Sequence, residues 1–347
     1  MRGSRTVQIR SHLVTIAAVA SIAALSLTAC GNEDAGAGTS TPPNQDGTDT
    51  VSYQIAITQF LDHPSLNAIT QGFKDVLSEK NVTVEYTYDD AQGDQANTAT
   101  IAGSYAANGD LDLILAVATP SAQAVVAQVT DRPVLYAGVT DPVAAGLVAG
   151  WKASGSNVTG TSDLNPEGRP AGLIQEIMGA DNVKTVGFLY SLGEKNSVVQ
   201  LEALEAEAEP LGITVVPSGI ANSSELATGV QALAEVDAIF VGTDNTVVSG
   251  LEQVVSFGQE HQIPLFVGDA ASVERGGVAT RGIDYYQLGR RTGEMAYQIL
   301  VEGQKAGDIP SLQVTDTEIV VNPDAAAAYG LTIPAAVLET AQEVSSS

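Results

Sequence analysis

Short apolar runs and stretches of helical periodicity alternate along most of this chain. In the first half, the apolar runs that predict buried strands are residues 53–58, 82–86, 111–118 and 134–137. Residues 63–77 lie between the first two runs and carry apolar side chains at helical spacing. Alternation of strands and helices predicts a parallel sheet with helices on both faces.

The same alternation starts again after residue 163. Further strands are expected at residues 185–190, 213–216, 265–267 and 319–322, and further helices at residues 197–209, 224–233 and 285–300. The pattern therefore predicts an α/β fold of two doubly wound parallel-sheet lobes joined by a three-strand hinge.

The last elements exceed what a second lobe needs, so the chain is expected to cross back, with the helix at 285–300 packing on the first lobe. The predicted first lobe comprises residues 51–160 and 283–308, and the second comprises residues 161–282 and 309–341. Connections near residues 160–163, 281–284 and 307–312 would form the hinge.

Residues 111–128 and 236–253 repeat one pattern: an apolar run, a polar turn and a helix. In this repeat Thr119 lies opposite Asp244, and Ser121 lies opposite Thr246. A strand that ends in a polar turn and a helix N-terminus is a typical anion site. Thr119 suits the helix cap and Pro120 suits the first helical position, so either turn alone is also explained as a capped helix.

The first 29 residues are typical of an export signal. Arg2, Arg5 and Arg10 precede an apolar stretch at residues 13–25, which is too short to span a membrane. The sequence from Leu27 to Cys30 resembles a bacterial lipobox, which implies that Cys30, the only cysteine, is lipidated. Residues 30–50 read as a flexible tether. We therefore expect an exported protein, lipid-anchored to the outer face of the cytoplasmic membrane.

The composition excludes several functions. The net charge of the whole chain is −26, and removal of residues 1–29 leaves 12 Lys and Arg against 41 Asp and Glu, a net charge of −29. Nucleic-acid binding is therefore not expected. The sequence has no phosphate-loop, dinucleotide-binding or nucleophile-turn motif, and His63 and His261 are its only histidines after the signal. We expect no catalytic residue, no metal and no cofactor in a monomeric protein.

Several motifs resemble those of the ABC-transporter substrate-binding lipoproteins of the tryptophan/tyrosine-binding type. They include Ala118-Thr119-Pro120-Ser121-Ala122-Gln123, Thr243-Asp244-Asn245-Thr246 and Gly282-Ile283-Asp284-Tyr285-Tyr286. The resemblance implies a type I periplasmic-binding fold and delivery of a small ligand to a membrane permease, with an amino acid, plausibly an aromatic one, as the ligand. Ala270 and Ala271 depart from the family pattern, which has a hydroxyl and an acid there, and leave the ligand's identity open.

A bound amino acid requires one site for its carboxylate and another for its ammonium. We assign the carboxylate to the turn of Thr119, Pro120 and Ser121. Asp269 and Asp244 are the first choices for the ammonium and Asp141 is the third, although Asp244 could equally be a helix cap.

The remaining candidates carry more than one interpretation. Asn245 is closer to a turn residue than to a contact, and Thr161, Ser162 and Asp163 suit a hinge or a ligand role equally. Gln59, Phe60 and His63 follow the first strand and face the expected cleft, although Phe60 could also belong to the core. Tyr285 and Tyr286 cannot both point inward.

Two alternatives stay open from sequence. The chain could be a sensor lipoprotein that signals to a membrane receptor, or a sugar- or nucleoside-binding protein of the same fold. A DNA-binding repressor of this fold is excluded by the export signal and the negative charge.

Overall fold

The computed structural model describes residues 51–346. Cys30, the export signal and the tether lie outside the described residues. Within residues 51–346, no helix is both long and apolar enough to cross a membrane.

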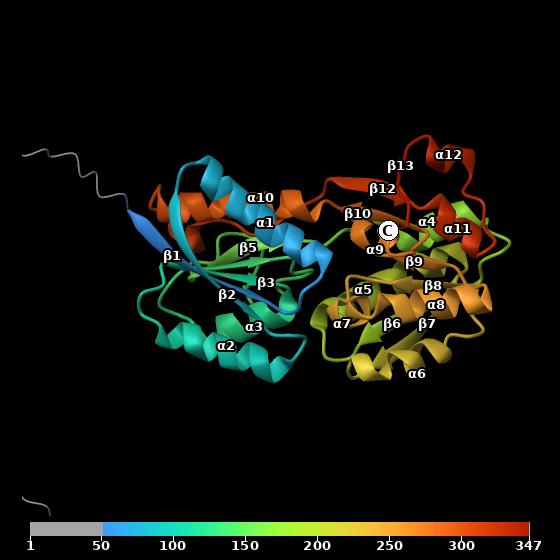
Figure 1. The fold of residues 1–347 in the computed structure, drawn as a ribbon, viewed down its shortest axis with the longest axis horizontal. Coiled ribbons are helices and arrows are strands. Elements are labelled where there is room, and N and C mark those ends of the chain that lie inside the picture. Colours follow the sequence, from blue (N-terminus) through green and yellow to red (C-terminus); the bar gives the residue numbers. More distant parts are fainter. Residues whose placement is uncertain (1–50, 347) are drawn as a thin grey trace, which may run out of the picture. The chain divides into compact units, whose positions relative to one another are not determined.

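The first lobe is built on a six-stranded parallel sheet in the order β11-β5-β4-β3-β1-β2. Its strands are β1 (Ser52–Gln59), β2 (Thr83–Asp90), β3 (Leu113–Val117), β4 (Val134–Ala137), β5 (Val158–Ser162) and β11 (Leu312–Gln313). Helices α1 (Pro64–Glu79) and α10 (Tyr285–Leu300) cover one face, and α2 (Gln95–Ala107) and α3 (Thr119–Gln128) cover the other (Figure 1). Alternate residues of the central strands β1, β3 and β4 feed two separate apolar clusters, one on each face.

The second lobe has a four-stranded parallel sheet in the order β7-β6-β8-β9 and its own apolar core. The strands are β6 (Thr185–Ser191), β7 (Thr214–Ile220), β8 (Ala238–Val241) and β9 (Leu265–Val267). A smaller sheet joins β10 (Ala279–Ile283), β12 (Thr317–Val321) and β13 (Gln342–Glu343), in which β10 and β12 are antiparallel. The structure therefore confirms the α/β class and the parallel sheets; this antiparallel pair was not predicted, because residue periodicity does not encode strand direction.

Short helices complete the second lobe. They are α4 (Pro170–Met178), α5 (Lys195–Ala208), α6 (Leu226–Gln231), α7 (Asn245–Ser249), α8 (Leu251–His261), α9 (Ala270–Glu274), α11 (Pro323–Ala328) and α12 (Ala335–Leu338). The 3₁₀ turns are η1 (Glu209–Leu211) and η2 (Ser223–Glu225), with η3 (Ala306–Asp308) beside the first lobe.

The chain passes between the lobes after β5, between β10 and α10, and between β11 and β12. Because β5 continues to Ser162 and β11 pairs with it, residues 161–162 and 312–313 lie in the first sheet. The predicted boundaries at residues 160 and 308 therefore come too early. The two-residue strand β11 is too short to give a periodic signal.

Helix α10 is attached to the first lobe through close contact with α1. A Cβ at Gly289 would overlap the carbonyl oxygen of Ile69, and one at Gly72 would overlap that of Tyr286. The absence of side chains at these positions lets the two backbones touch. This packing carries Tyr285, at the start of α10, to the boundary between the lobes.

Candidate functional site

A small cavity of about 20 Å³ lies between the lobes. This volume is well below the range of small-molecule sites. Its lining comes from both lobes and from the crossing segments: His63, Ser65, Leu66, Gly138, Thr140, Asp163, Asn196, Thr243, Asn245, Val248, Asp269 and Tyr285.

Hydrogen bonds connect the lobes around this cavity. Ser65 Oγ donates to Asp269 Oδ1 at 2.8 Å, and His63 Nε2 lies 3.4 Å from Asn245 Oδ1. Burial lowers the pKa of His63, against the opposing effect of the Asp269 charge. The two contacts show that the lobes are in a closed arrangement. The burial of His63 in this arrangement favours its neutral imidazole.

In the second copy of the repeated turn, the protein supplies its own anion. Glu194, only 1% exposed, accepts hydrogen bonds from the N–H groups of Asn245 and Thr246 at 3.1 and 2.8 Å, and from Thr246 Oγ1 at 2.8 Å. The Glu194 carboxylate thus occupies the N-terminal end of α7, where the peptide dipoles favour negative charge. Glu194 was not among the predicted residues.

Asp244 is the cap of the same helix. It accepts hydrogen bonds from the Val247 N–H at 2.8 Å and from Ser197 Oγ at 2.6 Å. Burial, and then the neighbouring Glu194 charge, raise the pKa of Asp244 to about 8. Asp244 does not line the cavity, so the structure favours the capping interpretation over ligand contact.

The first copy of the turn has no such internal carboxylate among the described residues. Thr119 and Ser121 are buried, and within residues 51–346 their hydroxyls have no hydrogen-bond partner. Helix α3 begins at Thr119, so Pro120 is at the second helical position and Ala118, with φ of 74°, precedes the helix in place of the predicted Thr119 cap. One of the two equivalent turns is therefore already satisfied by the protein and the other is not. Like Asp244, the predicted residues Thr119, Pro120 and Ser121 do not line the cavity.

Two of the residues that line the cavity have an unpaired acceptor oxygen. Asp163, 8% exposed, accepts the phenol O–H of Tyr285 on Oδ2 at 2.8 Å, while its Oδ1 has no partner in the described part of the chain. Burial raises the pKa of Asp163, and the Tyr285 hydrogen bond opposes this effect. Asn196 Oδ1 is also unpaired there. The Asn196 amide nitrogen donates to the Glu194 carboxylate, which orients the side chain. These two oxygens suit a ligand cation. Asp269 also lines the cavity, but it caps α9 by accepting the Ser272 N–H and hydroxyl, and it accepts Ser65 Oγ.

Three of the predicted residues, His63, Asn245 and Asp269, line the cavity. Gln59 and Phe60 do not: the Gln59 amide bonds to Leu61 O and Asn67, and the Phe60 ring lies in the apolar core. Gln59 and Phe60 therefore hold the start of α1 in place, whereas His63 lines the cavity.

The predicted hinge and turn residues also have partners within the protein. Asp141 accepts the N–H groups of Val143 and Ala144, as in a tight turn. Thr161 Oγ1 pairs with Thr292, and Ser162 Oγ donates to Thr140 O. None of these three side chains lines the cavity in the described structure, whereas the next residue, Asp163, does.

The structure separates the two neighbouring tyrosines. Tyr285 lines the cavity, whereas Tyr286 donates to Asp75 on α1 at 2.9 Å. Ala270 and Ala271, where the chain departs from the family pattern, line a different hollow. Glu194 and Asn196 were missed. Glu194 ends the turn after β6 and Asn196 lies in the first turn of α5, and this position after a strand end is the signal that could have found them.

Known proteins are similar to this chain over most of its length. Residues 54–345 match the family described as ABC transporter substrate binding protein. The chain is 36% identical over 275 residues to the tyrosine-binding protein of Clostridioides difficile strain R20291, a match that covers 78% of this chain and 79% of that protein.

Two solved structures are similar over most of their length. An ABC domain from Streptococcus pneumonia in complex with L-Trp is 39% identical, with a TM-score of 0.81, covering 85% of this chain and all of that one (100%). The ligand-free, open structure of a substrate binding protein from Clostridium difficile is 37% identical, with a TM-score of 0.64, covering 85% and 100%. The present lobe arrangement is thus more similar to the L-Trp complex than to this open structure.

Proposed function

We propose that this chain, which belongs to the ABC transporter substrate binding protein family, holds one free amino acid between its lobes and presents it to an ABC permease. Members of this family bind substrates and are not enzymes. The proposed ligand is of the tyrosine or tryptophan type, which is supported by the tyrosine-binding protein and the L-Trp complex, relatives that are 36% and 39% identical to this chain.

The difference between the two equivalent turns carries the proposal. Glu194 shows which chemistry this turn accepts, because a carboxylate receives its N–H and hydroxyl donors. The first-lobe turn presents two buried hydroxyls that lack a partner among the described residues. A buried polar group without a hydrogen bond costs about 1–3 kcal/mol, so a ligand carboxylate at Thr119 and Ser121 would remove this cost.

The ammonium of the same ligand would meet the opposite wall. Asp163 Oδ1, Asn196 Oδ1 and Asp269 are hydrogen-bond acceptors that line the cavity. A cation there would also offset the burial that raises the pKa of Asp163. A sugar supplies hydroxyls but no charge, so this arrangement favours a zwitterion over a sugar.

A ligand screen by thermal shift tests the proposal. The purified chain is heated with each of the twenty amino acids, with sugars and with nucleosides; a ligand at 100 times its Kd adds about 2.7 kcal/mol of stability. We expect stabilisation by amino acids, with tyrosine or tryptophan among the strongest. Stabilisation by sugars or nucleosides alone would contradict the proposal.

Removal of the two hydroxyls tests the carboxylate site. Thr119→Ala with Ser121→Ala should abolish the amino-acid shift and leave the unliganded melting temperature almost unchanged. Thr100→Ala with Ser104→Ala is the matched control, because these side chains are exposed on α2 and bond within their own helix. An amino-acid shift that survives in the first variant would remove Thr119 and Ser121 from the site.

Export and lipidation at Cys30 complete the proposed role, with the anchored protein at the outer face of the cytoplasmic membrane. They are supported by the basic and apolar signal and by the lipobox-like sequence before Cys30. Cells supplied with labelled palmitate should label the wild-type chain but not Cys30→Ser, and the variant should be released from the membrane. Equal labelling of both proteins would contradict lipidation at Cys30.

A further inference from the structure

We propose that His63, Asn245 and Glu194 form a pH-sensitive latch between the lobes. The closed arrangement requires a neutral His63 ring, so protonation of this ring in mildly acidic solution opens the lobes and weakens ligand binding. The latch goes beyond the proposed function, and it rests on that function only because amino-acid binding serves as the measure of lobe closure.

The three side chains of the latch are connected in series. His63 precedes α1 in the first lobe, whereas Glu194 and Asn245 precede α5 and start α7 in the second lobe. His63 Nε2 lies 3.4 Å from Asn245 Oδ1, and Asn245 Nδ2 donates to Glu194 Oε2. The Glu194 carboxylate therefore orients the Asn245 amide so that its oxygen, an acceptor, faces the first lobe.

The Asn245 oxygen determines which nitrogen of His63 carries the proton. Nε2 must hold the hydrogen to donate to Asn245, so Nδ1 of the neutral ring carries the lone pair. His63 as a whole is only partly buried, but its Nδ1 is buried and has no hydrogen-bond partner among residues 51–346. A proton added to Nδ1 would thus create a buried donor without an acceptor, and a positive charge shielded from water.

The two nearest acids do not supply the missing acceptor. Asp269 accepts the Ser65 hydroxyl and both the N–H and the hydroxyl of Ser272. Both oxygens of Glu194 accept hydrogen bonds within the second lobe, from Asn196, Asn245 and Thr246. These carboxylates act on the His63 ring through their charge and not through a hydrogen bond to Nδ1.

Burial outweighs the nearby charges in its effect on His63. It lowers the pKa of His63, whereas the Asp269 and Glu194 charges raise it and the Arg275 charge lowers it further. Other ionisable groups near the ring are Asp163 and Tyr285, which line the same cavity, and Asp62, which accepts the Asn67 amide on the exposed side of the same segment.

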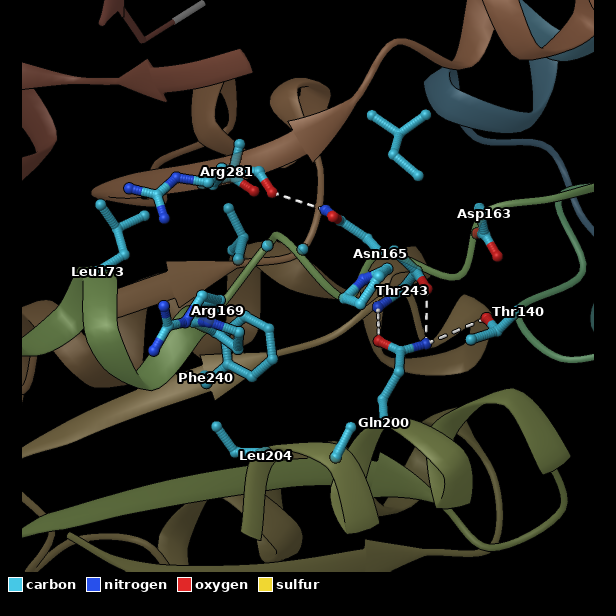
Figure 2. Close-up of a pocket in the computed structure, with 18 of the residues that line it drawn as sticks. Thr140, Asp163, Asn165, Arg169, Leu173, Gln200, Leu204, Phe240, Thr243 and Arg281 are labelled. Carbon is cyan, nitrogen blue, oxygen red and sulfur yellow. Dashed lines mark hydrogen bonds between the residues drawn. The ribbon is translucent and has the colours of Figure 1, made fainter. Parts of the chain in front are cut away.

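Another contact between the lobes does not depend on pH. Gln200 Nε2, on α5, lies 3.4 Å from Thr140 Oγ1, which follows β4 in the first lobe (Figure 2). Neither side chain ionises, so this contact holds equally at neutral and acidic pH. His261, the other histidine after residue 50, is exposed on α8. His63 is therefore the histidine at the lobe boundary.

The direction of the pH effect follows from the two states of His63. In open lobes Nδ1 reaches water, and the ring has an ordinary pKa near 6.5; closure lowers this pKa. The contribution of a neutral His63 to closure is fully present above about pH 6.5 and is lost as pH falls below it. Each pH unit below 6.5 reduces closure by up to about tenfold, until the pKa of the closed state is reached.

Calorimetric titration of the purified chain with L-tyrosine and L-tryptophan at pH 7.5 and pH 5.5 tests the latch. The ratio of affinity at pH 7.5 to affinity at pH 5.5 should be at least ~3-fold larger in the wild type than in His63→Gln, because the amide does not titrate. His261→Gln is the matched control, since it removes an exposed histidine and should keep the ratio of the wild type. Equal ratios in the wild type and His63→Gln would overturn the proposal.

Proton NMR of the histidine rings tests the latch without changing His63. His261→Gln assigns the two ring signals, and titration of the wild type then gives the pKa of each histidine with and without saturating tyrosine or tryptophan. The ligand should lower the pKa of His63 and leave that of His261 unchanged. An unchanged pKa of His63 would contradict the latch. A raised pKa would contradict it as well, because the ligand itself would then supply an acceptor for Nδ1.

The outcomes separate the latch from the proposed function. If an amino acid binds the wild type and His63→Gln with the same pH dependence, the latch is wrong and the amino-acid function stands. If no amino acid binds the wild type at either pH, the proposed function fails and the latch fails with it.

Discussion

The Tyr285 phenol donates a 2.8 Å hydrogen bond to Asp163 Oδ2, and thereby joins the start of α10 to the first residue after β5. These residues are 122 positions apart in sequence, yet both line the interlobe cavity. The bond leaves Asp163 Oδ1 as the free oxygen, and it favours the charged carboxylate against the effect of burial. Tyr285 is therefore a positioning residue for the ammonium site.

Tyr285→Phe should weaken amino-acid binding. Loss of the phenol donor removes the hydrogen bond that lowers the pKa of Asp163, so the carboxyl group holds its proton more strongly and attracts an ammonium less. A hydrogen bond to a charged group contributes about 1.5–3 kcal/mol, which predicts a loss of affinity of at least ~10-fold in calorimetric titration. Tyr286→Phe is the control, because its phenol bonds to Asp75 outside the cavity, and it should bind the ligand like the wild type. Similar losses in both variants would argue against the assignment.

Asp244 should make stability depend on pH. Its pKa in the folded protein is raised to about 8 by burial and by Glu194, above the unfolded value near 3.8. A raised acid pKa contributes stability that is fully present below the unfolded pKa and is lost as pH rises through the folded pKa. The contribution of Asp244 to the free energy of unfolding should therefore fall between about pH 4 and pH 8.

Asp244→Asn measures this contribution, because the amide does not titrate. Urea unfolding of both proteins at pH 5 and pH 8 should show a smaller decline for the variant. Asp163 and His63 also have shifted pKa values, but both are present in wild type and variant and cancel in the comparison. Parallel declines in the two proteins would show that Asp244 is ionised throughout this range.

Gly289→Ala should destabilise the first lobe. The added Cβ would overlap the Ile69 backbone in the contact between α1 and α10, and backbone cannot move aside as a flexible side chain can. Overpacking of this kind costs about 1–3 kcal/mol, measurable as a lower urea midpoint. Gly109→Ala is the control, because its Cβ would meet no atom within 4 Å among the described residues, and it should unfold like the wild type. An unchanged midpoint for Gly289→Ala would mean that the helices can separate without cost.

The sequence by itself determined most strands and helices of the two parallel sheets, the two-lobe α/β class and the repeated turn after β3 and β8, but not β10, β11 or β13. These features depend on local periodicity, on apolar runs and on the preferences of residues such as Pro120 at helix starts. It also singled out His63, Asn245 and Asp269, which line the cavity, because the carboxyl ends of parallel strands meet at one edge of a sheet.

Only the tertiary structure decided which polar groups are already satisfied. Thr119 and Asp244 are equivalent in the repeat, yet Asp244 caps a helix beside Glu194 while Thr119 has no partner among the described residues. Likewise, Tyr285 and Tyr286 are neighbours, and only Tyr285 faces the cavity. A hydrogen bond depends on distances between segments far apart in the chain, such as Glu194 and Thr246. Local sequence patterns carry no information about those distances.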